Sequence, residues 1–386
     1  MQNPALNSRI VLAPVENGYL AYDSASDQVH ELNPIAALIA ELCDGSRSVN
    51  EICAAVTPLL PEGKATEVER WIDDAVQAGL LVCDGGVATN HGSLSAKELS
   101  ELAKRLRRAG KVRLAFLCQQ TVVKLAGDDA DAWCYLGELA HIIGRRGDAR
   151  VAYEKYLSLE PDDAEIKHIL VALRDEAPPS RAPDECIQQL YERFSSFYES
   201  NVCDDLDYQG PDRIRELAQA ALGDREGLAL LDLGCGTGLA GVQLKPRAAR
   251  MVGIDLSPQM VELARARNLY DRLEVAEITD WLHRSSDHFD LIAACDCLIY
   301  FGDLRQVVVP AAQLLNQGGA VVFTVERGDR YPFHLTDSDR YTHHPDHIRE
   351  VAEEAGLRVV CLEEGYLRME YGKEVTGLFV ALKKAS

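Results

Sequence analysis

The first 90 residues change from a strand-like to a helical spacing of their apolar positions. Apolar and polar residues alternate, with the period of two that is typical of strands, over residues 9–15, 18–23 and 28–32. Three helices are predicted to follow. Asn33 and Pro34 are typical of the start of a helix over residues 35–43, and Ser48 is expected to cap a second one that extends to about residue 60. Residues 65–78 have the apolar spacing of an amphipathic helix. Two short runs have the pattern of a closing hairpin, over residues 80–83 and 86–88. This order predicts a winged-helix α+β domain over residues 1–90.

A purely helical segment follows at residues 96–176. It repeats with a spacing of about 34 residues, which is the period of the tetratricopeptide (TPR) repeat. The repeat that begins at Ala130 has the expected residues in register, namely Trp133, Leu136, Gly137, Ala149, Tyr153 and Pro161. A weaker copy begins at Ala96, and a last helix over residues 164–176 is expected to cap the array. We predict short TPR-like helical repeats, which either bind a protein segment or act as a spacer.

Residues 177–183 separate the helical segment from the last part of the chain. They contain three prolines, which exclude a regular helix, so we predict a linker. The segment 184–386 then contains the candidate catalytic domain. Its first buried-strand pattern, over residues 228–233, leads directly into the three glycines Gly234, Gly236 and Gly238. Glycines at such a turn permit positive φ angles and let a ligand lie against bare backbone.

The residues around this glycine turn suit a cationic nucleoside better than a pyrophosphate. Asp232 lies inside the strand end, where a carboxylate suits an ammonium or sulfonium group. The glycines have the spacing GxGxG, whereas a pyrophosphate-binding turn is expected to have GxGxxG. A second strand, over residues 250–254, ends in Asp255. A carboxylate at that position can accept hydrogen bonds from both ribose hydroxyls of an adenosine.

Two further strand ends supply the remaining candidate cofactor residues. Glu277 and Ile278 follow the third strand, over residues 273–276, and are expected to flank an adenine. Asp296 follows the fourth strand, over residues 289–294. Ligands of open α/β sheets bind at the carboxyl ends of the strands, so these residues are expected to meet at one site.

The stretches that carry these residues resemble class I methyltransferases that use S-adenosylmethionine (SAM). They read LLDLGCGTGL, MVGIDLSPQMVELARAR and FDLIAACDCLIYFGDL. The motifs YQGP and SDRYTHH, at residues 208–211 and 338–344, further resemble TPR-containing bacterial methyltransferases. This resemblance implies a Rossmann-like, seven-stranded α/β domain whose last strand is antiparallel, with SAM as methyl donor and S-adenosylhomocysteine as product. It implies a cofactor site formed by Asp232, Gly234, Cys235, Gly236, Gly238, Asp255, Leu256, Met260, Glu277, Ile278 and Asp296.

The first domain resembles PqqD-like domains, which are also called RiPP recognition elements. The resemblance rests on HELNPIAALIAELCDGSRSVNEIC, at residues 30–53, and on AGLLV, at residues 78–82. It implies that an extended leader peptide adds as a strand to the edge of the sheet and lies against the third helix. In this chain the edge is residues 28–32, and we expect Val29 and Trp71 to contact the peptide, with Val68 and Ile72 nearby.

The acceptor side of the site is expected to come from two segments that cover the cofactor. One precedes the glycine turn, and the other is the insert 327–344. The predicted acceptor-binding side chains are Tyr191, Tyr198 and Arg340. The candidates for catalysis are Tyr341, His343 and His344, because a neutral imidazole is available as a general base near pH 7. The D/N-P-P-Y motif of methylation at planar amide or adenine nitrogens is absent after the fourth strand, and other O- and N-acceptors stay open.

Composition limits the class of protein. The net charge of −21 argues against general nucleic-acid binding, and no apolar run approaches the ~20 residues that cross a bilayer. The chain begins without the basic and apolar pattern of a signal peptide. Its 11 cysteines form no CxxC pair and no zinc-like spacing, so we expect reduced thiols in a cytoplasmic protein and no metal site.

These observations favour one function and leave another open. We expect an enzyme that methylates a ribosomally made peptide, recruited through its leader by the PqqD-like domain. Residues 1–90 contain four basic and thirteen acidic side chains, so a leader with Lys or Arg would suit them. The alternative is a protein or small-molecule methyltransferase whose first two segments dock a partner protein. A non-catalytic scaffold is disfavoured by the intact glycine turn and Asp255. A homodimer is compatible with either function.

Overall fold

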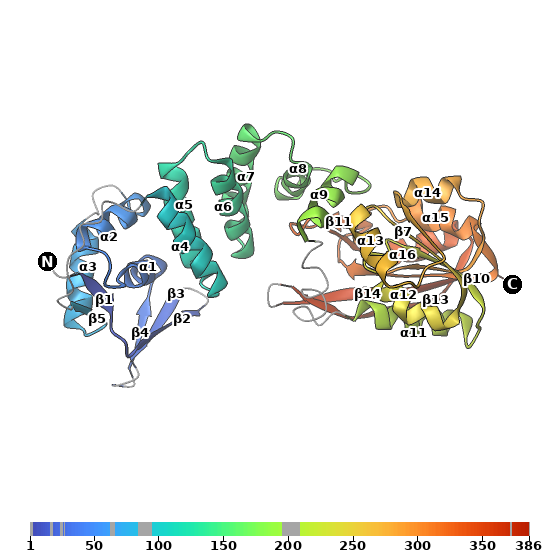
Figure 1. The fold of residues 1–386 in the computed structure, drawn as a ribbon, viewed down its shortest axis with the longest axis horizontal. Coiled ribbons are helices and arrows are strands. Elements are labelled where there is room, and N and C mark those ends of the chain that lie inside the picture. The colour runs from blue at the N-terminus through green and yellow to red at the C-terminus, as the bar shows by residue number, and fades with distance from the viewer. Residues whose placement is uncertain are drawn as a thin grey trace. The chain divides into compact units, whose positions relative to one another are not determined.

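The computed structural model describes residues 3–15, 18–23, 26, 28–61, 66–83, 95–194, 209–370 and 373–385. The chain forms two compact units, Met1–Asp162 and Asp163–Ser386. Figure 1 shows the order of helices and strands in each unit.

The first unit begins with a small antiparallel sheet and three helices. The sheet has the order β2-β3-β4, with β2 at Ile10–Val15, β3 at Gly18–Asp23 and β4 at Gln28–Leu32. The helices are α1 (Pro34–Leu42), α2 (Val49–Val56) and α3 (Thr66–Gln77), with the 3-10 helix η1 at Thr57–Leu59. The side chain of Asn33 accepts a hydrogen bond from the Ala36 amide at 2.9 Å, which explains why α1 begins there. The predicted strands and helices of this segment are therefore confirmed.

One strand pairing in this unit is not anticipated by the sequence. β1 (Pro4–Leu6) pairs antiparallel with β5 (Leu81–Cys83), so the first residues of the chain lie beside the end of the domain. The second strand of the predicted closing hairpin, over residues 86–88, lies outside the described residues. The winged-helix assignment therefore stays a prediction.

Four helices complete the first unit: α4 (Ala96–Arg108), α5 (Val112–Leu125), α6 (Ala130–Ile142) and α7 (Arg146–Leu159). Each packs against the next one along the chain. Gly137 makes close packing of α6 and α7 possible, because a Cβ atom there would lie 2.4 Å from the Tyr153 ring. Helix α5 also packs on α1, where Lys111 forms an ion pair with Glu41. The helices form two helical hairpins, α4–α5 and α6–α7, whose starts agree with the predicted repeat spacing along the chain. Their assignment as TPR repeats stays a prediction.

The second unit begins with α8 (Ala164–Leu173), α9 (Asp184–Phe194) and α11 (Gly210–Leu222). The predicted linker lies between α8 and α9 and contains no helix. It is packed rather than extended, since Ala182 is fully buried and its amide donates to the Tyr300 carbonyl at 2.8 Å. These bonds make residues 177–183 part of the second unit.

The second unit is organised around one mixed sheet. Its parallel strands are β6 (Leu228–Leu233), β7 (Ala248–Asp255), β8 (Arg272–Val275) and β9 (Phe289–Ala294), followed by β10 (Leu315–Arg327). The predicted antiparallel last strand is confirmed, because β14 (Lys373–Lys384) runs antiparallel to β10 and to β13 (Leu357–Glu370).

Among the described residues the sheet has nine strands rather than the seven that were expected. The two additional strands are β11 (Phe333–Leu335) and β12 (Tyr341–His343), and both come from the insert 327–344. They join the sheet because Glu326 and Arg327, at the end of β10, pair with Thr342 and His343 of β12. The insert is therefore an extension of the sheet.

Helices and short 3-10 turns connect the strands of this sheet. They are α12 (Leu239–Leu244), η3 (Lys245–Arg247), α13 (Pro258–Ala266), α14 (Ile278–Arg284), η4 (Leu298–Tyr300), α15 (Arg305–Gln313) and α16 (Pro345–Glu354). Both faces of the sheet are covered by apolar layers. In β6, Leu231 and Leu233 belong to one layer, whereas Leu228 and Leu230 belong to the other. Burial on both faces explains the uninterrupted apolar run of this strand.

Candidate active site

A pocket lies at the carboxyl ends of β6, β7 and β9 and extends to α9 and η4. The empty space that it encloses, together with the open solvent at its mouth, is about 610 Å³. It is lined by Arg181, Ile187, Tyr191, Gly234, Gly236, Asp255, Leu256, Glu277, Ile278, Cys295, Asp296, Cys297, Tyr300 and Phe301. The structure thus brings together seven of the predicted cofactor residues, namely Gly234, Gly236, Asp255, Leu256, Glu277, Ile278 and Asp296.

The glycine turn has the backbone conformation that its sequence requires. Gly234, Gly236 and Gly238 have φ angles of 61°, 53° and 90°, which side-chain-bearing residues rarely adopt. A Cβ atom at Gly234 would lie 2.5 Å from the Cβ of Cys297. At Gly236 no atom lies within 4 Å of the Cβ position, so the backbone there borders open space. The turn therefore offers bare backbone to a ligand in the pocket.

Asp255 connects the end of β7 to the glycine turn. Its carboxylate accepts hydrogen bonds from the amides of Gly236 and Ser257, both at 2.8 Å. Burial raises the pKa of Asp255, while these backbone hydrogen bonds act in the opposite direction. Because the residue also lines the pocket, its remaining acceptor capacity suits the ribose hydroxyls of a nucleoside.

Glu277 and Arg181 lie at the adenine end of the predicted site. Burial alone would raise the pKa of Glu277, but hydrogen bonds from Thr279 and Asp280 and the charge of Arg181 lower it below the usual value. Arg181 also forms an ion pair with Asp184. Glu277 is therefore a fixed, ionised acceptor beside the apolar side chain of Ile278.

Four of the predicted cofactor residues do not line the pocket: Asp232, Cys235, Gly238 and Met260. Asp232 is 1% exposed, and the hydroxyl of Tyr270 donates to its Oδ2 atom at 2.7 Å. The Oδ1 atom of Asp232 is buried without a hydrogen-bond partner among the described residues. The sequence pattern placed Asp232 correctly on the strand, but it gave no signal for its partner, Tyr270.

The burial of Asp232 leads to a prediction about stability. Burial raises the pKa of this carboxyl to about 7, opposed by the bond from Tyr270 and assisted by the charge of Asp255. The folded state therefore binds a proton more tightly than the unfolded state, so stability is lost as pH rises from about 4 to about 7. Over this pH range the free energy of unfolding should fall less for the variant Asp232→Asn than for the unaltered protein. The two decreases should differ by on the order of 2–4 kcal/mol. Urea unfolding of both proteins at pH values between about 4 and 8 tests this, and parallel curves would contradict it.

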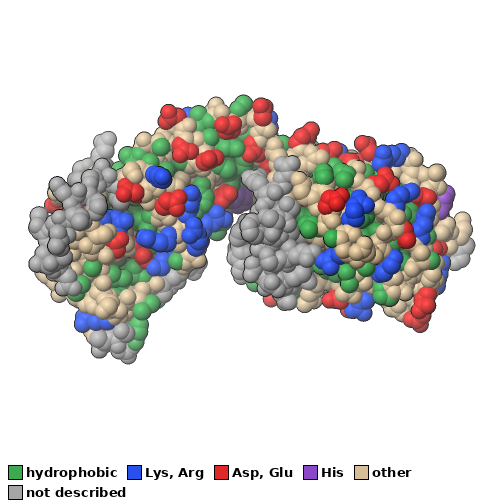
Figure 2. Space-filling model, viewed as in Figure 1, with side chains coloured by type: hydrophobic (Ala, Val, Ile, Leu, Met, Phe, Trp, Pro, Cys, Tyr) green, Lys and Arg blue, Asp and Glu red, His purple; other side chains and the backbone are tan. Residues whose placement is uncertain are grey.

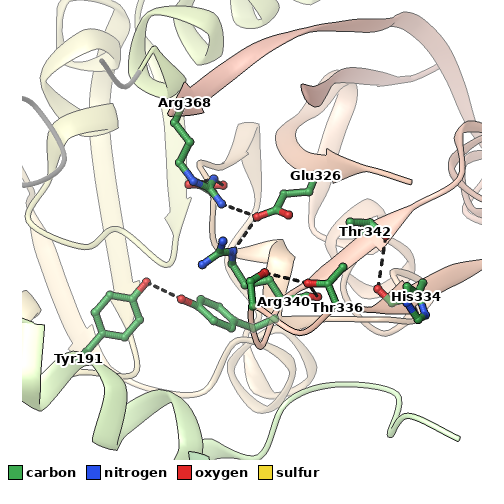
Figure 3. Close-up of polar contacts among 10 residues, drawn as sticks. Tyr191, Glu326, His334, Thr336, Arg340, Thr342 and Arg368 are labelled. Atoms are coloured by element: carbon green, nitrogen blue, oxygen red, sulfur yellow. Dashed lines mark hydrogen bonds and ion pairs between the residues drawn. The ribbon is translucent and has the colours of Figure 1, made fainter. Parts of the chain in front are cut away.

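Asp296 lies where β9 ends and is held by a buried ion-pair network. Arg368 of β13 donates to both oxygens of Asp296, at 3.1 and 2.9 Å, and also contacts Glu326. Glu326 in turn accepts a hydrogen bond from Nε of Arg340 at 2.7 Å. Figure 3 shows Arg368 and Arg340 on two sides of Glu326. The predicted acceptor residue Arg340 thus belongs to a network that reaches the pocket through Asp296.

Two tyrosines form another part of the pocket wall. The predicted acceptor residue Tyr191, on α9, lies with its hydroxyl oxygen 3.3 Å from that of Tyr300, at the end of η4. Tyr198 lies outside the described residues. Tyr300 was not among the predicted site residues, although it belongs to the stretch FDLIAACDCLIYFGDL that resembles class I methyltransferases.

The structure does not place the three catalytic candidates at the pocket. His343 is fully buried in β12, and its Nε2 atom lies 2.8 Å from the Phe301 carbonyl oxygen. His344 caps α16, since its side chain accepts a hydrogen bond from the Asp346 amide. Tyr341 is fully buried and donates to the Pro179 carbonyl at 2.8 Å. The pairing of β12 with β10 buries Tyr341 and His343, and His344 follows β12 at the start of α16. None of the three lines the described pocket wall, so their catalytic role stays a prediction without support from this geometry.

The two predicted peptide contacts lie in the first unit. Val29 is 56% exposed on β4, whereas Trp71 is half-buried on α3. Val68 and Ile72, which were expected nearby, are 1% and 2% exposed and belong to the core. Val29 and Trp71 therefore stay candidates for peptide contact, and Val68 and Ile72 do not.

Two parts of the chain match known protein families. Residues 231–321 match a family described as a methyltransferase domain, and residues 12–81 match the family of coenzyme PQQ synthesis protein D (PqqD). The magnesium-protoporphyrin O-methyltransferase of Rhodobacter capsulatus is 32% identical over 123 residues, which are 30% of this chain and 54% of that protein. The ubiquinone biosynthesis O-methyltransferase of Alkalilimnicola ehrlichii is 35% identical over 126 residues, 32% of this chain and 51% of that protein. The chain thus spans about half the length of these curated relatives.

A solved structure with a similar fold is an N-methyltransferase from Bradyrhizobium japonicum in complex with S-adenosylhomocysteine. It has 20% sequence identity and a TM-score of 0.42, and the match covers 52% of this chain and 98% of that chain. Together the sequence comparisons show a methyltransferase domain and a PqqD-like domain in the same chain. Among the described residues, no helix is long and apolar enough to cross a membrane, and no cluster of His, Cys, Asp and Glu could hold a metal.

Proposed function

We propose that this protein transfers the methyl group of SAM to a peptide that its PqqD-like domain recruits. The observation that carries the proposal is the presence, in one chain, of a PqqD-like domain and a pocket whose glycine turn and Asp255 suit SAM. A recognition domain with an exposed strand edge would be unnecessary for a small acceptor that enters the pocket directly. The domain therefore points to a peptide that must be held while one of its groups reacts.

The edge of the small sheet supports recruitment by strand addition. In the described part of the first unit, β4 pairs with β3 alone, so its other side can receive an extended peptide. Val29 is exposed there, and side chains of an added strand would pack against it. Backbone hydrogen bonds of the added strand would supply affinity, and neighbouring side chains would supply selectivity.

The charge of helix α3, in the same domain, indicates the chemistry of such a peptide. Helix α3 carries Glu67, Glu69, Asp73 and Asp74 against the single base Arg70. Acidic and basic side chains are both spread over the described surface that Figure 2 shows, so no single charged patch dominates that face. We infer that the recruited segment is neutral or basic, because an acidic leader would be repelled by α3.

The four helices α4 to α7 would brace the recruitment domain. Helix α5 packs on α1, and the hydroxyl of Thr121 lies 3.5 Å from the Ala55 carbonyl oxygen. These contacts tie the helical hairpins to the PqqD-like domain within one unit. We propose that the hairpins are TPR-like repeats that present the PqqD-like domain, or that add contacts to the same partner.

A small-molecule or protein acceptor is the second candidate function. It is favoured by the curated relatives, which are named as methyltransferases of ubiquinone biosynthesis and of magnesium-protoporphyrin. In that case the PqqD-like domain and the hairpins would dock a partner protein. The chemical class of the methylated acceptor distinguishes the two candidate functions.

Mass spectrometry of candidate substrates after incubation with the full chain and SAM tests the proposal. We expect a peptide to gain the mass of one methyl group in a reaction that S-adenosylhomocysteine inhibits. A control reaction with the Asp255→Ala variant should give a much smaller yield. Methylation of small molecules or intact proteins, without methylation of any peptide, would contradict the first candidate and favour the second.

A further inference from the structure

We propose that Arg181 is a positioning residue of the cofactor pocket, which holds the carboxylate of Glu277 toward the exocyclic amine of the adenine. This inference rests on the proposed function, because it assumes that SAM occupies the pocket. Arg181 belongs to the segment 177–183, and none of the residues in that segment was among the predicted site residues. It also precedes residues 231–321, which match the methyltransferase family. The proposal therefore assigns part of the cofactor selectivity to a segment outside that match.

The backbone that carries Arg181 is fixed against the pocket wall. The carbonyl of Ser180 accepts a hydrogen bond from the Gly302 amide at 2.8 Å. On the other side of Arg181, the amide of Ala182 donates to the Tyr300 carbonyl, also at 2.8 Å. Tyr300 itself lines the pocket. The side chain of Arg181 therefore begins at a point that is held from both sides and lies beside the pocket.

The guanidinium group of Arg181 lies near two carboxylates. Its Nη1 atom is 2.5 Å from Oδ1 of Asp184 and 3.6 Å from Oε1 of Glu277. Arg181 and Glu277 both line the pocket, and their side chains are 27% and 8% exposed. Solvent screens a partly buried pair of charges less than an exposed pair. The charge of Arg181 therefore acts on Glu277 at the pocket wall itself.

The two oxygens of Glu277 have different neighbours. Oε2 accepts hydrogen bonds from the Thr279 hydroxyl and from the Asp280 amide, the latter at 2.8 Å, and so caps α14. Oε1 is buried and is the oxygen that lies near Arg181. At 3.6 Å this contact is an attraction between charges rather than a hydrogen bond. A carboxylate oxygen has two acceptor sites, so Oε1 can accept from a ligand while the ion pair persists.

The charge state of Glu277 determines which purine fits beside it. Burial raises the pKa of this carboxyl, but the bonds from Thr279 and Asp280 and the charge of Arg181 lower it below the usual value, so the group is ionised at neutral pH. An ionised carboxylate only accepts hydrogen bonds. The exocyclic amine of adenine donates them, whereas hypoxanthine has a carbonyl oxygen at the same position. A site that is built to bind an amine discriminates strongly against an analogue without it. The pair of Arg181 and Glu277 therefore favours adenine over hypoxanthine.

Calorimetric binding of two ligands to the full chain tests this role. The ligands are S-adenosylhomocysteine and S-inosylhomocysteine, in which hypoxanthine replaces adenine. We expect the unaltered protein to bind the adenine ligand at least about tenfold more tightly. Arg181→Met should lower this ratio by at least about threefold, through weaker binding of the adenine ligand alone, because Oε1 of Glu277 is no longer held toward the amine. Arg181→Lys keeps the charge and should restore part of the ratio.

Two further variants show whether Arg181 acts through Glu277. Glu277→Gln should bring the ratio to within about twofold of one, because an amide both donates and accepts hydrogen bonds. Adding Arg181→Met to Glu277→Gln should not change the ratio again. Arg349→Met is the matched control, since Arg349 is exposed and forms an ion pair with Asp346 at 2.7 Å on α16. Both ligands should bind this variant as they bind the unaltered protein.

The outcomes separate this inference from the proposed function. Equal weakening of both ligands in Arg181→Met, with an unchanged ratio, would show a merely structural role and overturn the inference alone. A ratio near one in the unaltered protein would also overturn it, because Glu277 would then not contact the amine. No binding of S-adenosylhomocysteine to the unaltered protein would overturn the proposed function together with the inference.

Discussion

Replacing Asp255 with alanine is expected to weaken SAM binding by at least about tenfold, which corresponds to ~1.4 kcal/mol. A charge-assisted hydrogen bond contributes about 1.5–3 kcal/mol, and the carboxylate would accept one or two of them from the ribose hydroxyls. It also holds the glycine turn, because the amide of Gly236 donates to it at 2.8 Å. Asp255→Ala therefore removes a ligand contact and loosens the backbone that the ligand lies against. Isothermal titration calorimetry with SAM measures the change.

Two further variants make this result interpretable. Glu262→Ala removes a negative charge from α13 of the same unit, where the exposed Glu262 carboxylate forms an ion pair with Arg265 at 3.3 Å. We expect this control to bind SAM as the unaltered protein does. Asp255→Asn keeps the shape and one acceptor oxygen, so its affinity should lie between those of Asp255→Ala and the unaltered protein. Unchanged SAM affinity in Asp255→Ala would show that the ribose assignment is wrong.

Deleting the whole first unit, Met1–Asp162, is expected to raise KM for the peptide by at least about 100-fold, or ~2.7 kcal/mol. The reason is that the exposed edge of β4 and the acidic helix α3 are both lost. SAM affinity should stay the same, because every described residue of the pocket wall lies between Arg181 and Phe301. The deletion is made at the boundary of the unit because α5 packs on α1, so a cut after residue 90 would expose a buried face.

Steady-state kinetics of the truncated and full-length proteins test the role of this unit. The isolated first unit should compete for the peptide and inhibit the full-length enzyme, since it would retain the binding edge without the pocket. Methylation by the truncated protein with an unchanged KM would refute recruitment by the PqqD-like domain. A loss of SAM affinity in the truncated protein would instead show that the second unit depends on the first for its fold.

Much of the cofactor site could be predicted because it depends on local order along the chain. A strand, a glycine turn and a helix follow one another directly, and the carboxyl ends of parallel strands meet at one edge. Gly234, Asp255 and Asp296 therefore reached the pocket as predicted. The antiparallel last strand was predicted only because the resemblance to class I methyltransferases implies it.

The rest of the site depends on contacts between distant parts of the chain. Asp232 faces Tyr270 instead of the pocket, and no pattern in the sequence links these two positions. Arg181 reaches the pocket because the segment before α9 bonds to the residues after η4. His343 looked available in a polar insert, but β12 joins the sheet and buries it. Periodicity identifies strands and helices, whereas the direction of a polar side chain is decided by a partner far away in sequence.

A crystal structure of the protein with SAM tests the central claim most directly. The account predicts the methionine part of SAM against the backbone of Gly234 and Gly236, and the ribose hydroxyls within hydrogen-bond distance of Asp255. The methyl group should point toward the hydroxyls of Tyr191 and Tyr300. SAM bound elsewhere, or a pocket that stays filled by its own side chains at saturating SAM, would contradict the account.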